Sequence, residues 1–342
     1  MDPSTRSTAA ATAVVVLLVG LAIAVLVTLG GGVEPPAPTA ARGTTEPATV
    51  VPTSSAPTPT APATPKPTRT PRPTEPGLPQ GTGEVCVPQV SEKTLTVMTF
   101  NIKSGRVTGR VDMGRVGDQI AVYSPDIVLM QEVDKGRAWS NRLDEAAVLG
   151  QRLGMEWAFG GNDIRSPTNM LGNAILSRYP IRTSNNVQLP ALPGKHRRGL
   201  LGALVDVAGI EVEVYSTHLE HTSSADRERQ VGAIADVLGP REAPRFLGGD
   251  FNAGPTSAVM ARARTLATDT WSAVGSGAGF TAPSGRPRVR IDYLMHDGSD
   301  TVEVTPLLIR VLPTSASDHR AVMASYRLRQ DEGEICVPAL GD

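Results

Sequence analysis

A proline- and threonine-rich stretch from Glu34 to Gln80 limits which part of this chain can fold. Fourteen of the 29 prolines of the chain lie between Pro35 and Pro79, and the stretch contains no aromatic residue. Such a segment cannot bury enough apolar surface to offset the conformational entropy lost on folding. We predict a disordered linker over residues 30–84. This leaves about 250 residues from Val85 onward, which suits one sizeable domain at residues 85–338.

A stretch without any charged residue, Ser7 to Val33, precedes this linker. Residues 9–29 are almost wholly apolar, and about 20 such residues span a bilayer as a helix. The alternative is a cleaved signal peptide, whose apolar part usually has about 7–15 residues. We predict a short tail at residues 1–8 and a single transmembrane helix at residues 9–29. The linker is then either a cell-envelope stalk or a plain spacer that carries the domain outside the cytoplasm.

The only two cysteines, Cys86 and Cys336, bracket everything that is expected to fold. Each lies in nearly the same hexapeptide, Gly83–Pro88 and Gly333–Pro338. The ends of a domain often lie close together, so we predict a Cys86–Cys336 disulfide rather than two unrelated thiols. Disulfides persist in oxidising compartments, which favours an extracytoplasmic domain. Two cysteines alone cannot form a structural zinc site.

The composition argues against some classes of nucleic-acid binding. The formal net charge is −1, so no global basic field attracts nucleic acid. Aromatic residues make up 4% of the chain, so extended base-stacking platforms are not expected. A locally positive phosphate site is still compatible with both numbers.

Short apolar runs alternate with helical stretches from Leu95 onward, and continuous apolar runs indicate strands covered on both faces. We predict strands at Leu95–Phe100, Ile127–Met130, Ala174–Leu176, Leu201–Val207, Val212–Tyr215, Arg245–Leu247, Ile291–Met295 and Ala321–Leu328. We predict helices at Met113–Tyr123, Asn141–Leu153 and Ala225–Leu238. Ser223 with Asp226 forms a capping box before the last helix. Hairpins and crossover helices together predict an α/β fold built in layers.

Polar residues stand where these strands end. They comprise four carboxylates, two amides and two histidines: Asn101, Glu132, His218, Asp250, Asn252, Asp292, Asp318 and His319. One such residue alone is usually a cap, a turn or a packing residue. As a set they fit metal-assisted hydrolysis, because carboxylate and amide oxygens suit Mg²⁺ or Mn²⁺ and histidines suit proton transfer.

The segments that carry these residues resemble, in the same order, the motifs of the endonuclease/exonuclease/phosphatase superfamily. They are Met98–Ile102, Asp126–Val133, Ser216–Leu219, Gly249–Asn252, Arg290–Tyr293 and Ser317–Arg320. The resemblance covers about Thr94 to Arg329. It implies a four-layer α/β sandwich, with two mixed β-sheets packed face to face and helices outside. It also implies an Mg²⁺-dependent phosphoric ester hydrolase, with Mn²⁺ as a possible substitute.

The resemblance also implies which residues bind the metal. Glu132 resembles the principal metal carboxylate of the family. Asn101 and Asp318 are expected beside it, on the metal or on a metal-bound water.

Catalytic roles follow from the same resemblance. Asp250 is expected to orient or deprotonate the attacking water, and Asn252 to hold that water or the phosphate. His319, oriented by Asp292, is expected to bind the phosphate or transfer a proton. His218 is expected to contact the phosphate or protonate the leaving oxygen.

The sequence indicates the reaction chemistry more clearly than it indicates the substrate. Ser216–Leu219 resembles the deoxyribonuclease and sphingomyelinase branches, and Arg197–Leu201 is similar to small bacterial hydrolases of the family. Two basic clusters, around Arg198 and Arg290, are expected to bind phosphate, or else are solvated surface.

Three functions are compatible with these features. We expect an extracytoplasmic nuclease-like enzyme. The alternatives are a phosphodiesterase or phosphatase acting on lipid or headgroups, and a non-catalytic surface binding module. Intact motifs at every matched position argue against the binding module. No protein partner can be inferred.

Overall fold

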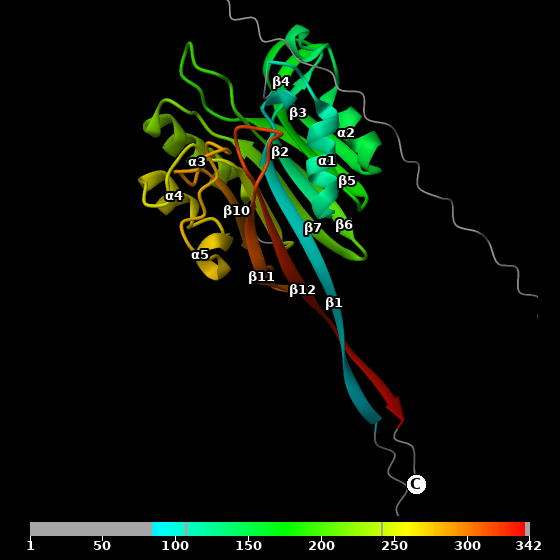
Figure 1. The fold of residues 1–342 in the computed structure, drawn as a ribbon. Helices are drawn as coiled ribbons and strands as arrows, with labels where there is room; N and C mark the ends of the chain where they lie inside the picture. Colours follow the sequence, from blue (N-terminus) through cyan, green and yellow to red (C-terminus); the bar gives the residue numbers. More distant parts are fainter. Residues whose placement is uncertain (1–83, 107–108, 241, 339–342) are drawn as a thin grey trace, which may run out of the picture. The chain divides into compact units, whose positions relative to one another are not determined.

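The computed structural model describes residues 84–106, 109–240 and 242–338 (Figure 1). The predicted N-terminal tail, transmembrane helix and all but the last residue of the linker lie outside this part of the chain. Among the residues described, no helix is both long enough and apolar enough to cross a bilayer.

The first sheet has six strands in the order β11-β12-β1-β2-β4-β3. The strands are β1 Glu84–Asn101, β2 Ile127–Lys135, β3 Glu156–Ser166, β4 Asn169–Ser177, β11 Val302–Leu312 and β12 Ala321–Pro338. Strands β1 and β2 are parallel, and the other neighbours are antiparallel. The parallel pair brings Asn101 opposite Gln131 at the edge where both strands deliver their polar residues.

The second sheet also has six strands, in the order β5-β6-β7-β8-β10-β9. The strands are β5 Ile181–Gln188, β6 Gly199–Val207, β7 Ile210–His218, β8 Arg245–Asp250, β9 Thr268–Asp269 and β10 Asp292–Asp297. Strands β7 and β8 run parallel with His218 opposite Asp250, and β10 runs antiparallel with Asp292 opposite Asp250. Three predicted site residues therefore meet at one end of this sheet.

Few helices accompany the sheets, and side-chain caps fix where the longer ones begin. They are α1 Met113–Tyr123, α2 Glu145–Leu153, α3 Ser224–Leu238, α4 Ala258–Ala263 and α5 Thr270–Val274, with short 3₁₀ turns η1 Lys103–Gly105 and η2 Ala138–Ser140. The Ser223 hydroxyl accepts the Asp226 N–H, as the capping box predicts. Helix α2 begins four residues later than predicted because the Asp144 carboxylate accepts the Ala147 N–H.

The apolar core lies in three layers. Side chains of both sheets, among them Val97, Leu129 and Phe246, form one buried cluster. A second cluster joins the first sheet to α1 and α2, and a third joins the second sheet to α3 and α4. The prediction of two mixed sheets packed face to face is confirmed.

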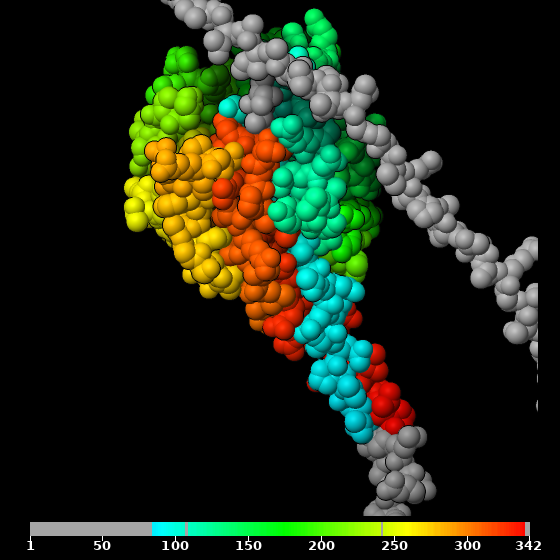
Figure 2. Space-filling model, viewed as in Figure 1, coloured from blue at the N-terminus to red at the C-terminus, as the bar shows by residue number. Residues whose placement is uncertain are grey.

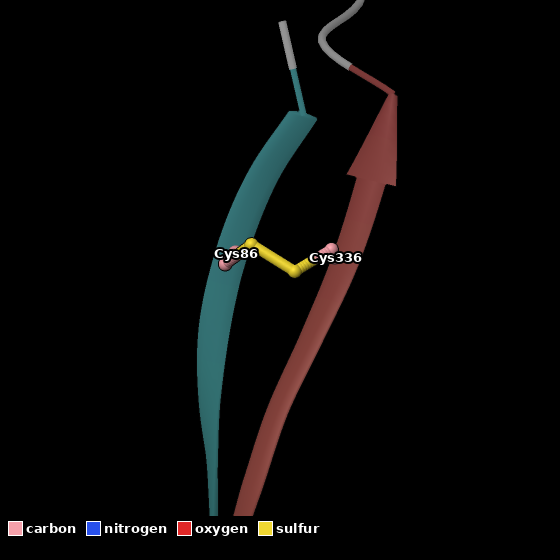
Figure 3. Close-up of a disulfide and its surroundings, with 2 residues drawn as sticks. All are labelled: Cys86 and Cys336. Carbon is pink, nitrogen blue, oxygen red and sulfur yellow. A yellow bond between two sulfur atoms is a disulfide. The ribbon is translucent and has the colours of Figure 1, made fainter.

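Strands β1 and β12 continue past the sheet as a two-stranded ribbon (Figures 1 and 2). Cys86 lies opposite Cys336 in this ribbon, and the two sulfurs are bonded (Figure 3). The predicted disulfide is confirmed, although the strands around it were not predicted.

The repeated hexapeptides give the ribbon a local two-fold symmetry. Val85 pairs with Val337, and Val87 pairs with Ile335. Cross-strand partners share a face of a sheet, so these four apolar side chains lie together on the face opposite the disulfide. All four are about half exposed.

Candidate functional site

The two sheets are joined by hydrogen bonds directly beneath the predicted site. Gln131 of β2 donates through Nε2 to Ser216 Oγ of β7, at 3.0 Å. Asn173 of β4 donates through Nδ2 to the carbonyl oxygens of Gly199 and Ser216, at 3.0 and 3.1 Å. These buried amides hold the strand ends of both sheets at a fixed separation.

Asn101 connects residues of both sheets. Its Nδ2 donates to Glu132 Oε1 at 3.1 Å and to Asp250 Oδ2 at 3.2 Å. Its Oδ1 accepts the Lys103 N–H at 3.1 Å. In this arrangement Asn101 holds two carboxylates together through its amide nitrogen. Direct metal binding by Asn101 stays a prediction.

A bulge inside β2 sets the direction of the Glu132 side chain. Glu132 has φ +53°, and the β2–β4 register shifts between Met130 and Val133. A bulge of this kind redirects one side chain, and a non-glycine residue in this conformation costs about 1–3 kcal/mol. The strain lies at the residue that is predicted to be the main metal ligand.

A glycine allows β7 and β8 to approach each other next to the site. A Cβ on Gly249 would lie 1.9 Å from the carbonyl oxygen of Thr217. Only glycine therefore fits in the pair of strands that presents His218 and Asp250.

His319, which is partly exposed, pairs with the buried Asp292. His319 Nδ1 lies 2.9 Å from Asp292 Oδ2 and 3.1 Å from Oδ1. Burial by itself lowers the pKa of His319, but the Asp292 carboxylate outweighs burial and raises the pKa to about 10. The imidazole is thus held in its cationic form, with Nε2 3.8 Å from Asp250 Oδ2.

Asp250 and His218 lie side by side at the centre of the site. His218 Nε2 is 3.4 Å from Asp250 Oδ2 and 3.1 Å from Asn252 Nδ2. Burial, followed by the negative charge of Asp292, raises the pKa of Asp250 to about 7. Burial, followed by the Arg198 charge, lowers the pKa of His218 well below its usual value. His218 is therefore neutral and His319 charged.

The two arginines predicted to bind phosphate differ in their surroundings. Arg290 donates through both terminal nitrogens to Asp269, at 3.0 Å each, so its guanidinium is occupied by a structural ion pair. Arg198 is buried in a cavity wall with Glu132 and His218. Its Nε makes no hydrogen bond among the described residues and lies 3.9 Å from Glu220 Oε2, a looser ion pair than that of Arg290. Arg198 is the better placed of the two to bind a phosphate group.

Lys103 was missed by the sequence analysis. Lys103 lies in η1, directly after β1, and its ammonium group forms an ion pair with Asp318. The only signal in the sequence is its position, directly after the Met98–Ile102 motif.

The donor set fits a divalent cation. One carboxylate oxygen each of Asp250 and Asp292 and one ring nitrogen of His319 lie within 4.8 Å of one another. The two carboxylates can bind a cation directly, whereas the cationic imidazole would have to lose its proton first. Glu132 and Asp318 add further carboxylates, and burial followed by the charge of Asp292 raises the pKa of Asp250, as expected for a carboxylate held in a crowded, desolvated site. Such crowding of carboxylate oxygens suits Mg²⁺ or Mn²⁺.

Three cavities that share lining residues lie along the site, and they are together called the groove below. One is lined by Lys103, Arg106 and Trp139, and it shares Glu132 and Leu171 with the cavity of Arg198. The cavity of Arg198 shares Arg197 with a third cavity, which is also lined by Lys195. The groove thus carries cationic side chains on both sides of Glu132.

Comparisons with known proteins agree with this geometry. A sequence model described as "Endonuclease/Exonuclease/phosphatase family" matches residues 98–319. The uncharacterized protein YbhP of Escherichia coli (strain K12) is 28% identical over 178 residues, which cover 48% of this chain and 69% of YbhP.

Solved structures share the fold. An endonuclease/exonuclease/phosphatase from Beutenbergia cavernae DSM 12333 is 27% identical with a TM-score of 0.57, covering 69% of this chain and 72% of that one. D. rerio TDP2 in complex with a single-strand DNA product is 21% identical with a TM-score of 0.55, covering 68% and 98%. At that identity TDP2 supports the fold alone.

Proposed function

Because this chain belongs to the endonuclease/exonuclease/phosphatase family, we propose that it is a metal-dependent phosphoesterase that hydrolyses phosphodiester bonds of nucleic acid. The observation that carries the proposal is the hydrogen-bonded convergence of Asn101, Glu132 and Asp250 from strands of both sheets. An extracytoplasmic location, with residues 9–29 as the membrane anchor, is part of the proposal and is supported by the Cys86–Cys336 disulfide.

Hydrolysis adds one water to phosphorus, breaks one P–O bond, and transfers a proton to the departing alkoxide. A bound Mg²⁺ would supply positive charge to the non-bridging oxygens and lower the pKa of a water. Glu132 and Asp318 are the carboxylates proposed to hold it, with Asn101 fixing Glu132 against Asp250.

The remaining residues have roles that follow from their contacts. Asp250 lies between His218 and His319 and is proposed to orient the attacking water and accept its proton. His319, held by Asp292, is proposed to bind a phosphate oxygen as a cation. His218 and Asn252 are proposed to position the leaving oxygen and the phosphate.

The groove favours nucleic acid over a single small phosphate. Lys103 and Arg106 lie on one side of Glu132, and Arg197 and Arg198 lie on the other. One phosphate needs fewer cations than this, whereas a polyanionic strand contacts several.

The test is a substrate panel with the purified full-length protein. We expect Mg²⁺-dependent cleavage of plasmid DNA that stops when a chelator is added. Asp250→Asn and His319→Ala should each lower turnover by roughly 10²–10⁴-fold and leave the circular dichroism spectrum unchanged. Asp236→Asn, an exposed carboxylate on α3, is the matched control and should retain activity.

Two outcomes would contradict this assignment. Near-normal turnover in either site variant would reject the catalytic roles. Release of phosphocholine from vesicles without DNA cleavage would favour the lipid-headgroup alternative.

A further inference from the structure

Trp139 is an exposed aromatic residue in the cavity beside the proposed metal carboxylate. It belongs to the η2 turn, is 46% exposed, and lines the cavity together with Leu171 and Glu132. The cavity has a volume of about 400 Å³, within the range of ligand pockets. The aromatic wall is thus directly next to the place where the phosphate is proposed to bind.

Contacts with two buried residues hold the indole ring in one orientation. Trp139 Nε1 donates to Asp134 Oδ2 at 2.6 Å, and Asp134 is fully buried. The guanidinium carbon of Arg137 lies 4.8 Å from the ring centroid, and Arg137 is itself buried. Arg137 therefore stacks on the ring at short range, and Arg165 lies farther from it, at 5.8 Å from the centroid, so that 46% of the side chain stays exposed. A flat group could stack there without first ordering the side chain.

Cations surround this platform. Lys103 and Arg106 line the same cavity, and the Arg165 guanidinium carbon lies 5.8 Å from the ring centroid. Arg106 forms no ion pair with any of the described residues. An aromatic face beside cationic side chains is the arrangement that binds single-stranded nucleic acid, through base stacking and phosphate contacts.

We propose that Trp139 is the base-binding platform of a nucleotide subsite, which stacks the nucleobase in the cavity that Trp139 shares with the proposed metal ligand Glu132. The inference rests on the proposed nuclease function and adds the part of the substrate that is recognised. A single platform of this kind needs only one aromatic residue, so it agrees with the low aromatic content of the chain.

The subsite can be tested by equilibrium binding, without turnover. Calorimetry would compare thymidine 5′-monophosphate with deoxyribose 5-phosphate, which lacks the base. We expect the wild type to prefer the nucleotide by about 5- to 150-fold, the range that base–aromatic stacking gives. Trp139→Ala should bring that ratio close to one, and Trp139→Phe should keep part of it.

Trp157 provides the matched control. It is 42% exposed and packs against α2 at Gly150, and it does not line the cavity of Trp139. Trp157→Ala should therefore keep the wild-type ratio. Trp139→Phe is a control for misfolding of Trp139→Ala, because it keeps an aromatic ring at this position although it loses the hydrogen bond to Asp134.

The outcomes separate the subsite from the enzyme function. Equal affinities in the wild type, or an unchanged ratio in Trp139→Ala, overturn the subsite even if the protein cleaves DNA. A nucleotide preference that depends on Trp139 supports the subsite, and a failure to cleave DNA would then reject only the nuclease assignment.

Discussion

Glu145 is a buried acid whose titration affects the stability of the fold. One carboxylate oxygen accepts the Asp134 N–H at 2.7 Å, and the other has no hydrogen-bond partner among the described residues. Burial outweighs that hydrogen bond and raises the pKa of Glu145 to about 8. The folded state therefore holds a proton on this residue at pH values where the unfolded chain has lost it.

This predicts a stability that falls as pH rises. Below a pH of about 4.5 both states carry the proton, and above about 8 neither does, so the folded state loses stability between these values. Glu145→Gln keeps the acceptor for Asp134 without the charge. It should raise the unfolding free energy at pH 8.5 by on the order of 1–2 kcal/mol, since its unpaired amide offsets part of the gain.

Denaturant titrations at pH 5 and pH 8.5 would measure this effect. The exposed Glu211→Gln is the control and should change little at either pH. An equal effect of Glu145→Gln at both pH values would contradict the explanation by titration.

The sequence predicted most of the residues that the site brings together, because most of them lie at strand ends. Glu132 is the exception, since β2 continues past the predicted end at Met130 to Lys135 and Glu132 lies at a bulge inside it. Asn101, Glu132 and Asp250 are linked by hydrogen bonds. The sequence could not show that Arg198 is better placed than Arg290 to bind phosphate, because the ion pair of Arg290 with Asp269 depends on a tertiary contact. Trp139 carried no local signal, because only the folded chain places it beside Glu132.

At the scale of elements, strands with continuous apolar runs were predictable and edge strands were not. Strand β5 reads as polar, with Ser184, Asn185 and Asn186 in its middle, and it is an edge strand with mostly exposed residues. Strand β11 is also an edge strand, and its register with β12 shifts beside Pro306. Edge strands need less apolar surface, so alternation is too weak to identify them.

The disulfide is predicted to contribute to global stability without affecting catalysis. It closes a loop with a sequence separation of 250, and in the chain-entropy model such a crosslink stabilises by up to about 5 kcal/mol. Cys86→Ser with Cys336→Ser should lower the unfolding free energy by about 2–5 kcal/mol.

Thermal denaturation and the DNA cleavage assay would test this together. Turnover at 25 °C should stay at the wild-type level, because the bridged pair lies on the ribbon of β1 and β12 that extends past the sheets (Figure 1). A loss of turnover in a folded double variant would show that the ribbon also supports the site.

At the scale of the whole molecule, cationic side chains are concentrated at one place although the formal net charge of the chain is only −1. The groove gathers Arg106, Lys195 and Arg197 around a cluster of carboxylates. Binding of DNA should therefore weaken as salt increases, in spite of the nearly neutral chain.

The salt dependence can be assigned to single residues. Arg197→Ala should reduce the slope of log affinity against log salt by about 0.7–0.9, which corresponds to one phosphate contact. Arg310→Ala, an exposed arginine on edge strand β11, should leave the slope unchanged. Fluorescence anisotropy with a labelled oligonucleotide would measure both, and equal slopes in all three proteins would argue against the groove.

The bridged ribbon also determines how the domain responds to mechanical force. A pull applied between the chain before Cys86 and the chain after Cys336 is transmitted through a covalent sulfur bond. The 249 residues between the two cysteines are then bypassed by the load, and the strands that carry Asn101 and Glu132 experience no tension.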